Sequence, residues 1–393
     1  MVKGLVLAGG GAKGSYQVGV YEALQELGWR PNVIAGTSVG CLNGAMFALD
    51  KLETARAMWL TIEDEQIMKK PRDPSSAELA EFLKNVVRRG GMDVSPLEDT
   101  IRRALDEEAL RRGPVNFGLV TVNKRTLKPL ELTLEEIPQG RLADYMLASA
   151  ACFPAFTSRN IDGEEFIDGG YHDNMPLSLA ARMGADELVA VDVDGVGVVR
   201  PNNTGLPTTY ISSRWDLGSL LEFDPAVAKR NMALGYQDCY RAFGKMLGSI
   251  YAISPASEMQ LKEEFVRPYA RILKRVIGKN PALALTEKAA LLPLEGVFTL
   301  GENRALAPLE RACELADVDP AKIYNAEELF QAFLERFPEK TGQKFMPLFA
   351  DKKDITIREA AMAAASPGDF LQAMVWAALT KQDEQLQPEI LLG

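Results

Sequence analysis

The chain has 393 residues, a formal net charge of −10, and a composition that is 47% hydrophobic and 25% charged. This length allows one large domain or two, and the composition is typical of a soluble globular protein. The negative charge gives no general attraction to nucleic acid or anionic lipid, and no apolar run is long enough for a signal peptide or a membrane span. The widely spaced cysteines (Cys41, Cys152, Cys239 and Cys313) and the single histidine predict reduced thiols in a cytoplasmic protein without a metal site.

The N-terminal third begins with a strand, a glycine loop and a helix. Residues 4–8 are wholly apolar, which is typical of a central parallel strand covered on both faces. The glycine loop at 9–14 follows, and then a helix with an apolar stripe that ends before Gly28. A second apolar run, residues 33–35, completes a βαβ unit. This order predicts a parallel sheet whose strand ends bring the glycine loop beside residue 38.

Ser38 lies between Gly36 and Gly40 at the end of the second strand. A strand that turns directly into a helix brings backbone against backbone, so that a Cβ at either glycine would collide. The residue at such a turn is strained, and its side chain points outward at a helix N-terminus, where negative charge is favoured. The pattern therefore indicates a nucleophile, with an ordinary β–α turn as the alternative.

The glycine loop has three interpretations. It matches G-x-G-x-x-G, but the acid that a dinucleotide site needs about 20 residues later is missing, and Lys13 is not followed by Ser or Thr as in a phosphate-binding loop. A purely structural turn is the second interpretation. The third is an oxyanion hole beside Ser38. Its predicted donors are Gly9, Gly10, Gly11, Ala12, Lys13 and Gly14, together with Val39.

Further helices and strands are predicted along the rest of the chain. The segment 50–113 is read as helices and loops, and residues 200–216 as a loop. The predicted elements are helices at 77–87 and 96–110, an antiparallel pair at 115–122 and 127–134, a helix at 142–151, two short strands around Asp162-Gly163, a helix after Pro176, a strand at 188–192, and helices at 261–277, 329–337 and 370–379.

Ser38 needs a base, because a serine hydroxyl is a weak nucleophile. His172 could serve in a triad, but Asp168 lies too close before it in the chain for the usual arrangement. Asp168 could instead accept the proton directly, which requires a carboxylate in a dry pocket. It ends an apolar run and precedes Gly169 and Gly170. A loop aspartate that makes a turn hydrogen bond is the alternative.

Taken together, the motifs at 9–14, 36–40 and 168–170, with the stretch 148–156, resemble the bacterial patatin-like acyl hydrolases. The resemblance implies a three-layer α/β/α fold with a mostly parallel sheet. It implies that residues 1–200 form the catalytic domain. The helical stripes beyond this domain predict that residues 201–393 form a mainly helical region packed on it. The resemblance also implies a Ser38–Asp168 dyad, an oxyanion hole in the glycine loop, and a non-catalytic His172. Many members of the family have arginine where Lys13 stands.

The function that this resemblance implies is a serine esterase of the lipase, phospholipase or lysophospholipase type. It would act on a lipid or fatty-acyl ester through an acyl-enzyme, with no cofactor and no nucleic-acid partner. Transient contact with a membrane or micelle surface and an oligomeric state are both compatible with it. Two other classes stay open: a Rossmann-type nucleotide-binding enzyme and a non-catalytic lipid-binding protein.

Overall fold

A computed structural model describes residues 1–69, 84, 86, 90–278, 304–337, 339–350, 362–363 and 365–380. The predicted helix at 77–87 lies almost entirely outside the described residues. The chain folds into two compact units, Met1–Ala242 and Phe243–Gly393. Within the described residues, no helix combines the length and the apolar character needed to cross a bilayer.

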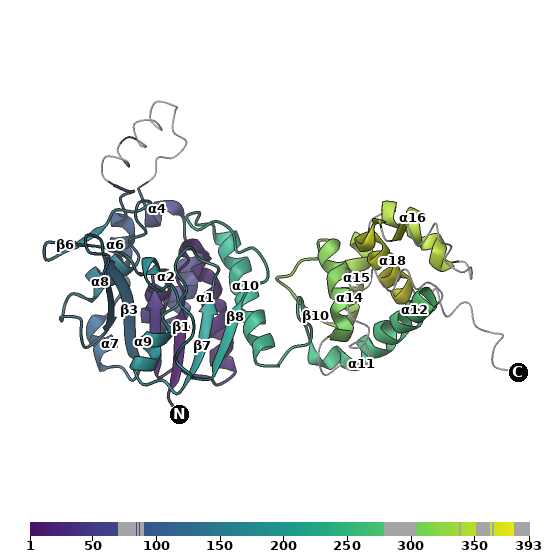
Figure 1. Cartoon of the computed structure of the whole chain (residues 1–393), viewed down its shortest axis with the longest axis horizontal. Helices are drawn as coiled ribbons and strands as arrows, with labels where there is room; N and C mark the ends of the chain where they lie inside the picture. Colours follow the sequence, from purple (N-terminus) through teal and green to yellow (C-terminus); the bar gives the residue numbers. More distant parts are fainter. Residues whose placement is uncertain are drawn as a thin grey trace, which may run out of the picture. The chain divides into compact units, whose positions relative to one another are not determined.

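The first unit is organised around an eight-stranded sheet of described residues with the order β5-β6-β3-β2-β1-β7-β8, in which β4 also pairs with β3 (Figure 1). The strands are β1 (Lys3–Leu7), β2 (Val33–Thr37), β3 (Asn116–Asn123), β4 (Pro129–Thr133), β5 (Arg159–Ile161), β6 (Glu164–Asp168), β7 (Glu187–Asp192) and β8 (Thr208–Ser212). Strands β3, β2, β1, β7 and β8 run parallel, whereas β4, β5 and β6 form the antiparallel part. The predicted mostly parallel sheet is confirmed.

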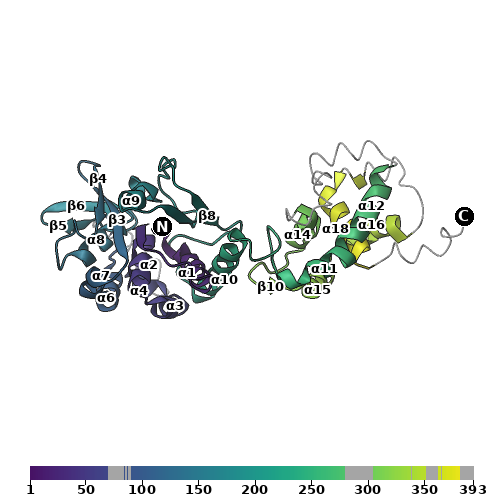
Figure 2. The same cartoon turned by 90° about the horizontal axis from the view of Figure 1, so that it is seen from below.

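Helices cover both faces of this sheet (Figure 2). On one face, α9 (Leu177–Arg182) packs on a buried cluster that includes Val6, Val33, Val120 and Ala190. On the other face, α2 (Val39–Ala48) lies so close that a Cβ on Gly44 would contact Ile34, Phe117 and Leu7. The two sets alternate along each strand because successive side chains point to opposite faces. The unit therefore has three layers, α/β/α.

Helices α1 (Ser15–Glu26) and α10 (Pro225–Ala242) meet backbone to backbone on the α2 face. A Cβ on Gly19 would lie 1.8 Å from the Met232 carbonyl oxygen, and one on Gly235 would lie 2.1 Å from the Tyr16 carbonyl oxygen. The Tyr16 hydroxyl also donates to the buried Asp238 carboxylate at 2.7 Å. Helix α10 is therefore an integral part of the first unit.

The predicted domain boundary at residues 200/201 differs from the boundary of the structure. Strand β8 pairs over its whole length with β7, and α10 packs on α1. The first unit consequently extends to Ala242. The segment at 200–207 is rich in Pro, Asn and Gly because it is a loop between neighbouring parallel strands.

The other helices of the first unit are α3 (Leu52–Leu60), α4 (Asp64–Ile67), α6 (Ser95–Ala104), α7 (Glu107–Arg112) and α8 (Leu142–Ser149). The single helix predicted at 96–110 is thus two helices. The chain breaks because the Asp106 carboxylate accepts the Ala109 N–H at 2.9 Å and begins a new helix. Ion pairs fasten α6 to its neighbours, with Glu98 bonded to Arg159 of β5 at 2.7 Å and Arg102 bonded to Asp144 of α8 at 2.8 Å.

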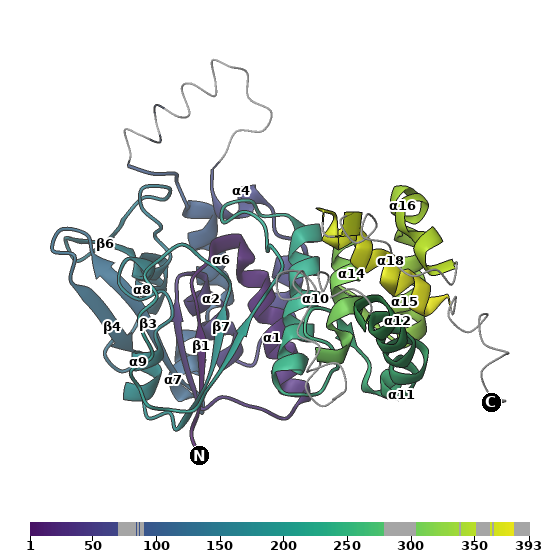
Figure 3. The ribbon, with the colours of Figure 1, turned by 45° about the vertical axis from the view of Figure 1, so that its right-hand side comes forward.

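The described part of the second unit is mainly helical (Figure 3). Its elements are β9 (Ala252–Ile253), α11 (Glu258–Leu261), a π-helical turn (Lys262–Val266), α12 (Arg267–Gly278), α14 (Ala307–Leu315), β10 (Ile323–Tyr324), α15 (Ala326–Arg336), α16 (Glu339–Ala350) and α18 (Pro367–Leu379), with short 3-10 turns at Pro255–Ser257 and Arg304–Leu306. Helix α18 contacts α12, α14 and α16, and its Phe370 packs against Phe345 and Phe349. The apolar stripes predicted at 261–277 and 370–379 fall in helices, and the stripe at 329–337 falls in α15 except for Phe337, which follows the last residue of that helix.

Candidate active site

Strand β2 turns into helix α2 at Ser38, which has φ 56° and ψ −128°. This positive φ is rare for a residue with a side chain and marks a strained turn. A Cβ on Gly36 would lie 2.4 Å from the Gly40 carbonyl oxygen, and one on Gly40 would lie 2.2 Å from the Leu7 carbonyl oxygen. The backbone approach expected at both glycines is therefore present, and it leaves the Ser38 side chain at the end of the strand.

The register of the sheet brings Ser38 and Asp168 together. Thr37 of β2 lies opposite Val120 of β3, and the next residue of β3, Thr121, lies opposite Asp168 of β6. Ser38 and Asp168 line one cavity of about 350 Å³, and the Ser38 side chain lies close enough to the Asp168 carboxylate to stabilise its ionised form. The two side chains that the sequence singled out are therefore neighbours in one cavity.

Asp168 is buried, with 6% of the residue exposed. Burial raises its pKa to about 6, although the hydrogen bond from the Gly170 N–H, at 2.8 Å, and the nearby Ser38 side chain act in the opposite direction. Gly169 holds the turn, because a Cβ there would lie 2.3 Å from the Val120 carbonyl oxygen. A carboxylate with this pKa is ionised at neutral pH and is a stronger base than an exposed aspartate.

The amides of the glycine loop divide into two groups. The N–H groups of Gly9, Ala12 and Lys13 donate to the carbonyls of Asn174, Leu220 and Gly10, at 3.1, 2.9 and 3.2 Å. These three predicted oxyanion donors are therefore engaged within the protein, and the prediction is corrected for them. Gly14 ends the short helix Gly11–Gly14 and packs against Val39, so it too lies outside the cavity of Ser38 and Asp168.

The remaining predicted donors are Gly10, Gly11 and Val39. None of their N–H groups has an acceptor among the described residues. Gly10 and Gly11 line the cavity that holds Ser38 and Asp168, and Val39 is the first residue of α2, directly after Ser38. A Cβ on Gly11 would lie 2.1 Å from the Leu220 carbonyl oxygen, and its φ is 53°, so glycine is required there.

Two residues that the sequence did not single out position this machinery. Ser149 is fully buried, and its Oγ accepts the Ser38 N–H at 3.0 Å. Asn174 donates from Nδ2 to the Gly9 carbonyl at 3.0 Å, while its own carbonyl accepts the Gly9 N–H. Ser149 lies in the stretch 148–156 that carried part of the resemblance, and Asn174 lies four residues after Gly170. Both residues could therefore have been found from their position in or near a recognised motif.

His172 and Lys13 serve as anchors rather than as parts of the cavity wall. The ring of His172 lies between Arg200, 2.8 Å from Nδ1, and Glu131, 3.4 Å from Nε2. The Lys13 Nζ donates to the Asp194 carbonyl at 2.8 Å, and its side chain is 14% exposed. Neither residue lines either of the cavities at Ser38.

Cys152 is the one cysteine that lines the cavity of Ser38 and Asp168 among the described residues. Burial and the nearby Asp168 raise the pKa of its thiol to about 11. The thiol is therefore neutral at physiological pH, and a neutral thiol is a poor nucleophile.

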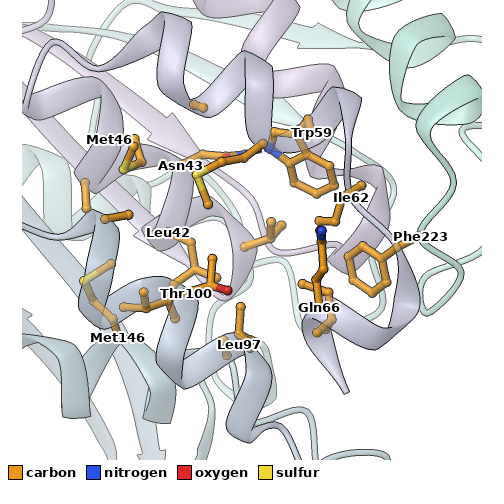
Figure 4. A pocket seen from close by; sticks show the side chains of 18 of the residues that line it. Leu42, Asn43, Met46, Trp59, Ile62, Gln66, Leu97, Thr100, Met146 and Phe223 are labelled. Carbon is orange, nitrogen blue, oxygen red and sulfur yellow. Dashed lines mark hydrogen bonds between the residues drawn. The ribbon is translucent and has the colours of Figure 1, made fainter. Parts of the chain in front are cut away.

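A second cavity of about 320 Å³ begins at Ser38 and is mainly apolar (Figure 4). Its wall comes from α2, α3, α6, α8 and the segment before α10, with Leu42, Met46, Trp59, Leu97, Met146 and Phe223. Asn43, a polar residue of the wall, bonds to Gln17 at 2.9 Å and to the Trp59 ring N–H at 3.1 Å. Because these polar atoms satisfy one another, the cavity offers an apolar surface to a ligand.

The first unit is thus an α/β domain with a serine at the turn from β2 to α2. This serine lies between a cavity that contains an aspartate and a cavity that is mainly apolar. Residues 5–181 match the family model for Patatin-like phospholipase. The match to a patatin-like phospholipase domain spans these residues, and the resemblance drawn from the motifs is confirmed there.

Curated relatives and a solved structure are similar to this chain. "Lysophospholipase nte1" of Aspergillus terreus is 27% identical over 239 residues, which cover 59% of this chain and 15% of that protein. "Patatin-like phospholipase domain-containing protein 7" of Rattus norvegicus is 29% identical over 193 residues, which cover 48% of this chain and 13% of that protein. The chain therefore corresponds to a small part of these relatives. The crystal structure of VipD from Legionella pneumophila aligns with a TM-score of 0.38 and 15% identity, over 97% of this chain and 91% of that one.

Proposed function

We propose that this protein is a serine acyl hydrolase of lipid esters, with Ser38 as nucleophile and Asp168 as base. The observation that carries the proposal is the placement of Ser38 in one cavity with a buried carboxylate, Asp168, whose pKa is raised to about 6. An adjacent base is what a serine needs to become a nucleophile. The patatin-like phospholipase domain and the lysophospholipase relatives support a lipid substrate.

The proposed reaction has two halves. Ser38 Oγ forms a bond to the ester carbonyl carbon while its proton passes to Asp168, and the N–H groups of Gly10, Gly11 and Val39 stabilise the oxyanion. The intermediate collapses, Asp168 returns the proton to the leaving alkoxide, and an acyl-enzyme remains. Water then attacks the acyl carbon, and its proton passes to Asp168. As the bond to Ser38 Oγ breaks and the fatty acid leaves, Asp168 returns this proton to Ser38 Oγ, and the enzyme is regenerated. The apolar cavity accommodates the acyl chain.

The Ser38→Ala variant tests the nucleophile. We expect it to lose ester hydrolysis by at least about 10⁴-fold, because no acyl-enzyme can form, while its thermal unfolding stays unchanged. Ser212→Ala, at an exposed serine that ends β8, is the control and should keep wild-type turnover. Labelling with a fluorophosphonate, followed by peptide mass mapping, should place the adduct on Ser38 in the wild type and the control.

Two results would favour the other classes. A wild-type protein that binds lipid but gives neither turnover nor a fluorophosphonate adduct would be a lipid-binding protein. Saturable binding of a dinucleotide at the glycine loop would identify a nucleotide-binding enzyme. Normal hydrolysis by Ser38→Ala would exclude the proposed mechanism altogether.

A further inference from the structure

The loop that follows β7 exposes valines at the mouth of the active-site cavity. We call residues 194–200, Asp-Gly-Val-Gly-Val-Val-Arg, the valine loop. Val196 is 84% exposed, Val198 is 49% exposed and Val199 is 48% exposed. Val196 and Val198 line the cavity that contains Ser38 and Asp168, and so does Tyr171, which is 49% exposed. The outer rim of this cavity is therefore apolar.

The active-site loops themselves hold the valine loop in place. The Val198 N–H donates to the Gly170 carbonyl at 2.8 Å, and the Val198 carbonyl accepts the Asn174 N–H at 2.7 Å. At Gly195 the loop approaches the glycine loop so closely that a Cβ would lie 2.0 Å from the Gly9 carbonyl oxygen. The exposure of the valines is consequently fixed by bonds to the Asp-Gly-Gly turn and by contact with the glycine loop.

Both ends of the valine loop are also fastened by long basic side chains. Lys13 donates to the Asp194 carbonyl at 2.8 Å at the start of the loop. Arg200 donates to the His172 carbonyl at 3.0 Å at its end. The two basic anchors and the single histidine thus act on the same rim, from the glycine loop on one side and the Asp-Gly-Gly turn on the other.

We propose that the valine loop inserts into the surface of a lipid aggregate and so brings the mouth of the cavity to its substrate. Single exposed apolar residues are ordinary on protein surfaces, but these share one tethered loop on the rim of one cavity. The transfer of a water-exposed valine side chain into an apolar phase lowers the free energy. This inference rests on the proposed function, because the cavity beside the loop is taken to be the site of lipid hydrolysis.

The charges around the loop indicate which surface it fits. The Asp194 side chain is fully exposed, whereas the Lys13 ammonium is mostly covered and Arg200 bonds to His172. The whole chain carries a formal net charge of −10. Anionic lipid is therefore disfavoured, and the loop suits a zwitterionic surface such as phosphatidylcholine. Such binding is apolar, so it should not weaken as salt is raised.

The binding experiment uses the full chain with Ser38→Ala, so that the vesicles stay intact. We expect the affinity for phosphatidylcholine vesicles, measured by sedimentation, to fall about tenfold when Val196→Ser and Val199→Ser are added. This loss corresponds to about 1.4 kcal/mol of binding free energy. Val196→Trp should increase binding, which a folding defect could not do. Met259→Ser, at a 76% exposed residue of the second unit, is the matched control and should bind as the parent protein does.

The activity experiment compares two substrates on the active enzyme. In the Val196→Ser, Val199→Ser variant we expect the ratio of vesicle phospholipid turnover to monomeric butyryl ester turnover to fall about tenfold. An unchanged ratio with unchanged vesicle binding would overturn the inference. Equal losses on both substrates would also overturn it, and would make the loop part of the cavity structure. If the variant instead loses a dimer in size-exclusion chromatography while vesicle binding persists, the valines form a contact between copies.

The two proposals can fail separately. If the wild type hydrolyses neither ester, the proposed function fails. The vesicle experiment still decides the valine loop in that case, because it measures binding without turnover. A lipid surface that binds through the valines would then support the loop as a lipid contact on a protein that is not a hydrolase.

Discussion

The two cavities that meet at Ser38 are built in different ways. The cavity of Asp168 is formed by loops at strand ends, and its polar groups include backbone amides of Gly10 and Gly11. The apolar cavity is formed by side chains on helices, among them Leu42 of α2 and Leu97 of α6. The first cavity therefore depends on backbone positions and the second on side-chain volume. This difference predicts that chemistry and chain-length preference can be changed independently.

The largest expected effect comes from the polar cavity. Asp168→Asn should lower hydrolysis by about 10³-fold, because the amide cannot accept the proton of Ser38. The loss should be the same for a butyryl and a palmitoyl ester, since the apolar cavity is untouched. Steady-state kinetics on both esters measures it.

Asp173→Asn is the matched control for Asp168→Asn. Asp173 is also buried, and burial raises its pKa to about 6, but its carboxylate accepts the Met175 N–H at 3.1 Å and lines neither cavity. Its variant should keep turnover within a few-fold. If both variants lose activity alike, the role of Asp168 is structural and the dyad is wrong.

A smaller effect is expected in the apolar cavity. Thr100 of α6 points into it, and its hydroxyl donates to the Pro96 carbonyl of the same helix at 2.9 Å (Figure 4). Thr100→Phe should reduce kcat/KM for the palmitoyl ester by about twentyfold, because the added ring takes the volume of the chain, and should spare the butyryl ester. Asp99→Phe, on the exposed side of α6, should change neither. An equal loss on both esters would contradict the separation of the two cavities.

The smallest effect is the response to pH. Because the pKa of Asp168 is raised to about 6, the ionised base is lost as the pH falls through that value. We expect kcat/KM to level off above pH 7 and to be about tenfold lower at pH 5, with the same profile for both esters. The Asp173→Asn variant should keep this profile. A rate that is flat between pH 5 and 8 would show that no carboxylate with this pKa acts as the base.

The sequence predicted the parts of the site that depend on local backbone geometry. Gly36 and Gly40 indicate the strand-to-helix turn at Ser38, because a side chain at either position would collide with backbone atoms. The structure has this close backbone approach at both glycines. The βαβ order placed the glycine loop beside Ser38 for the same general reason that strand ends meet at one edge of a sheet. Asp168 was predicted from the Asp-Gly-Gly motif. The residues that surround it in the structure lie on β3 and β2, far away in the sequence.

The rest depended on contacts between distant segments. Gly10 and Ala12 lie in the same loop, and the sequence predicted both as oxyanion donors. The Ala12 N–H, however, donates to the Leu220 carbonyl, which belongs to a segment far along the chain. Ser149 looked like one small residue in a helix, and only the folded chain brings its hydroxyl to the Ser38 amide. The boundary at 200 was misplaced because a loop composition marks a loop and does not distinguish a linker from a connection between paired strands.

The Leu220 carbonyl has a practical consequence for dissecting the protein. It accepts the Ala12 N–H from outside the region matched by the family model, and Phe223, a few residues on, completes the apolar wall. A fragment trimmed to the matched residues would lack β8, α10 and both of these contributions. The compact unit Met1–Ala242 retains every described wall of the two cavities together with β8 and α10.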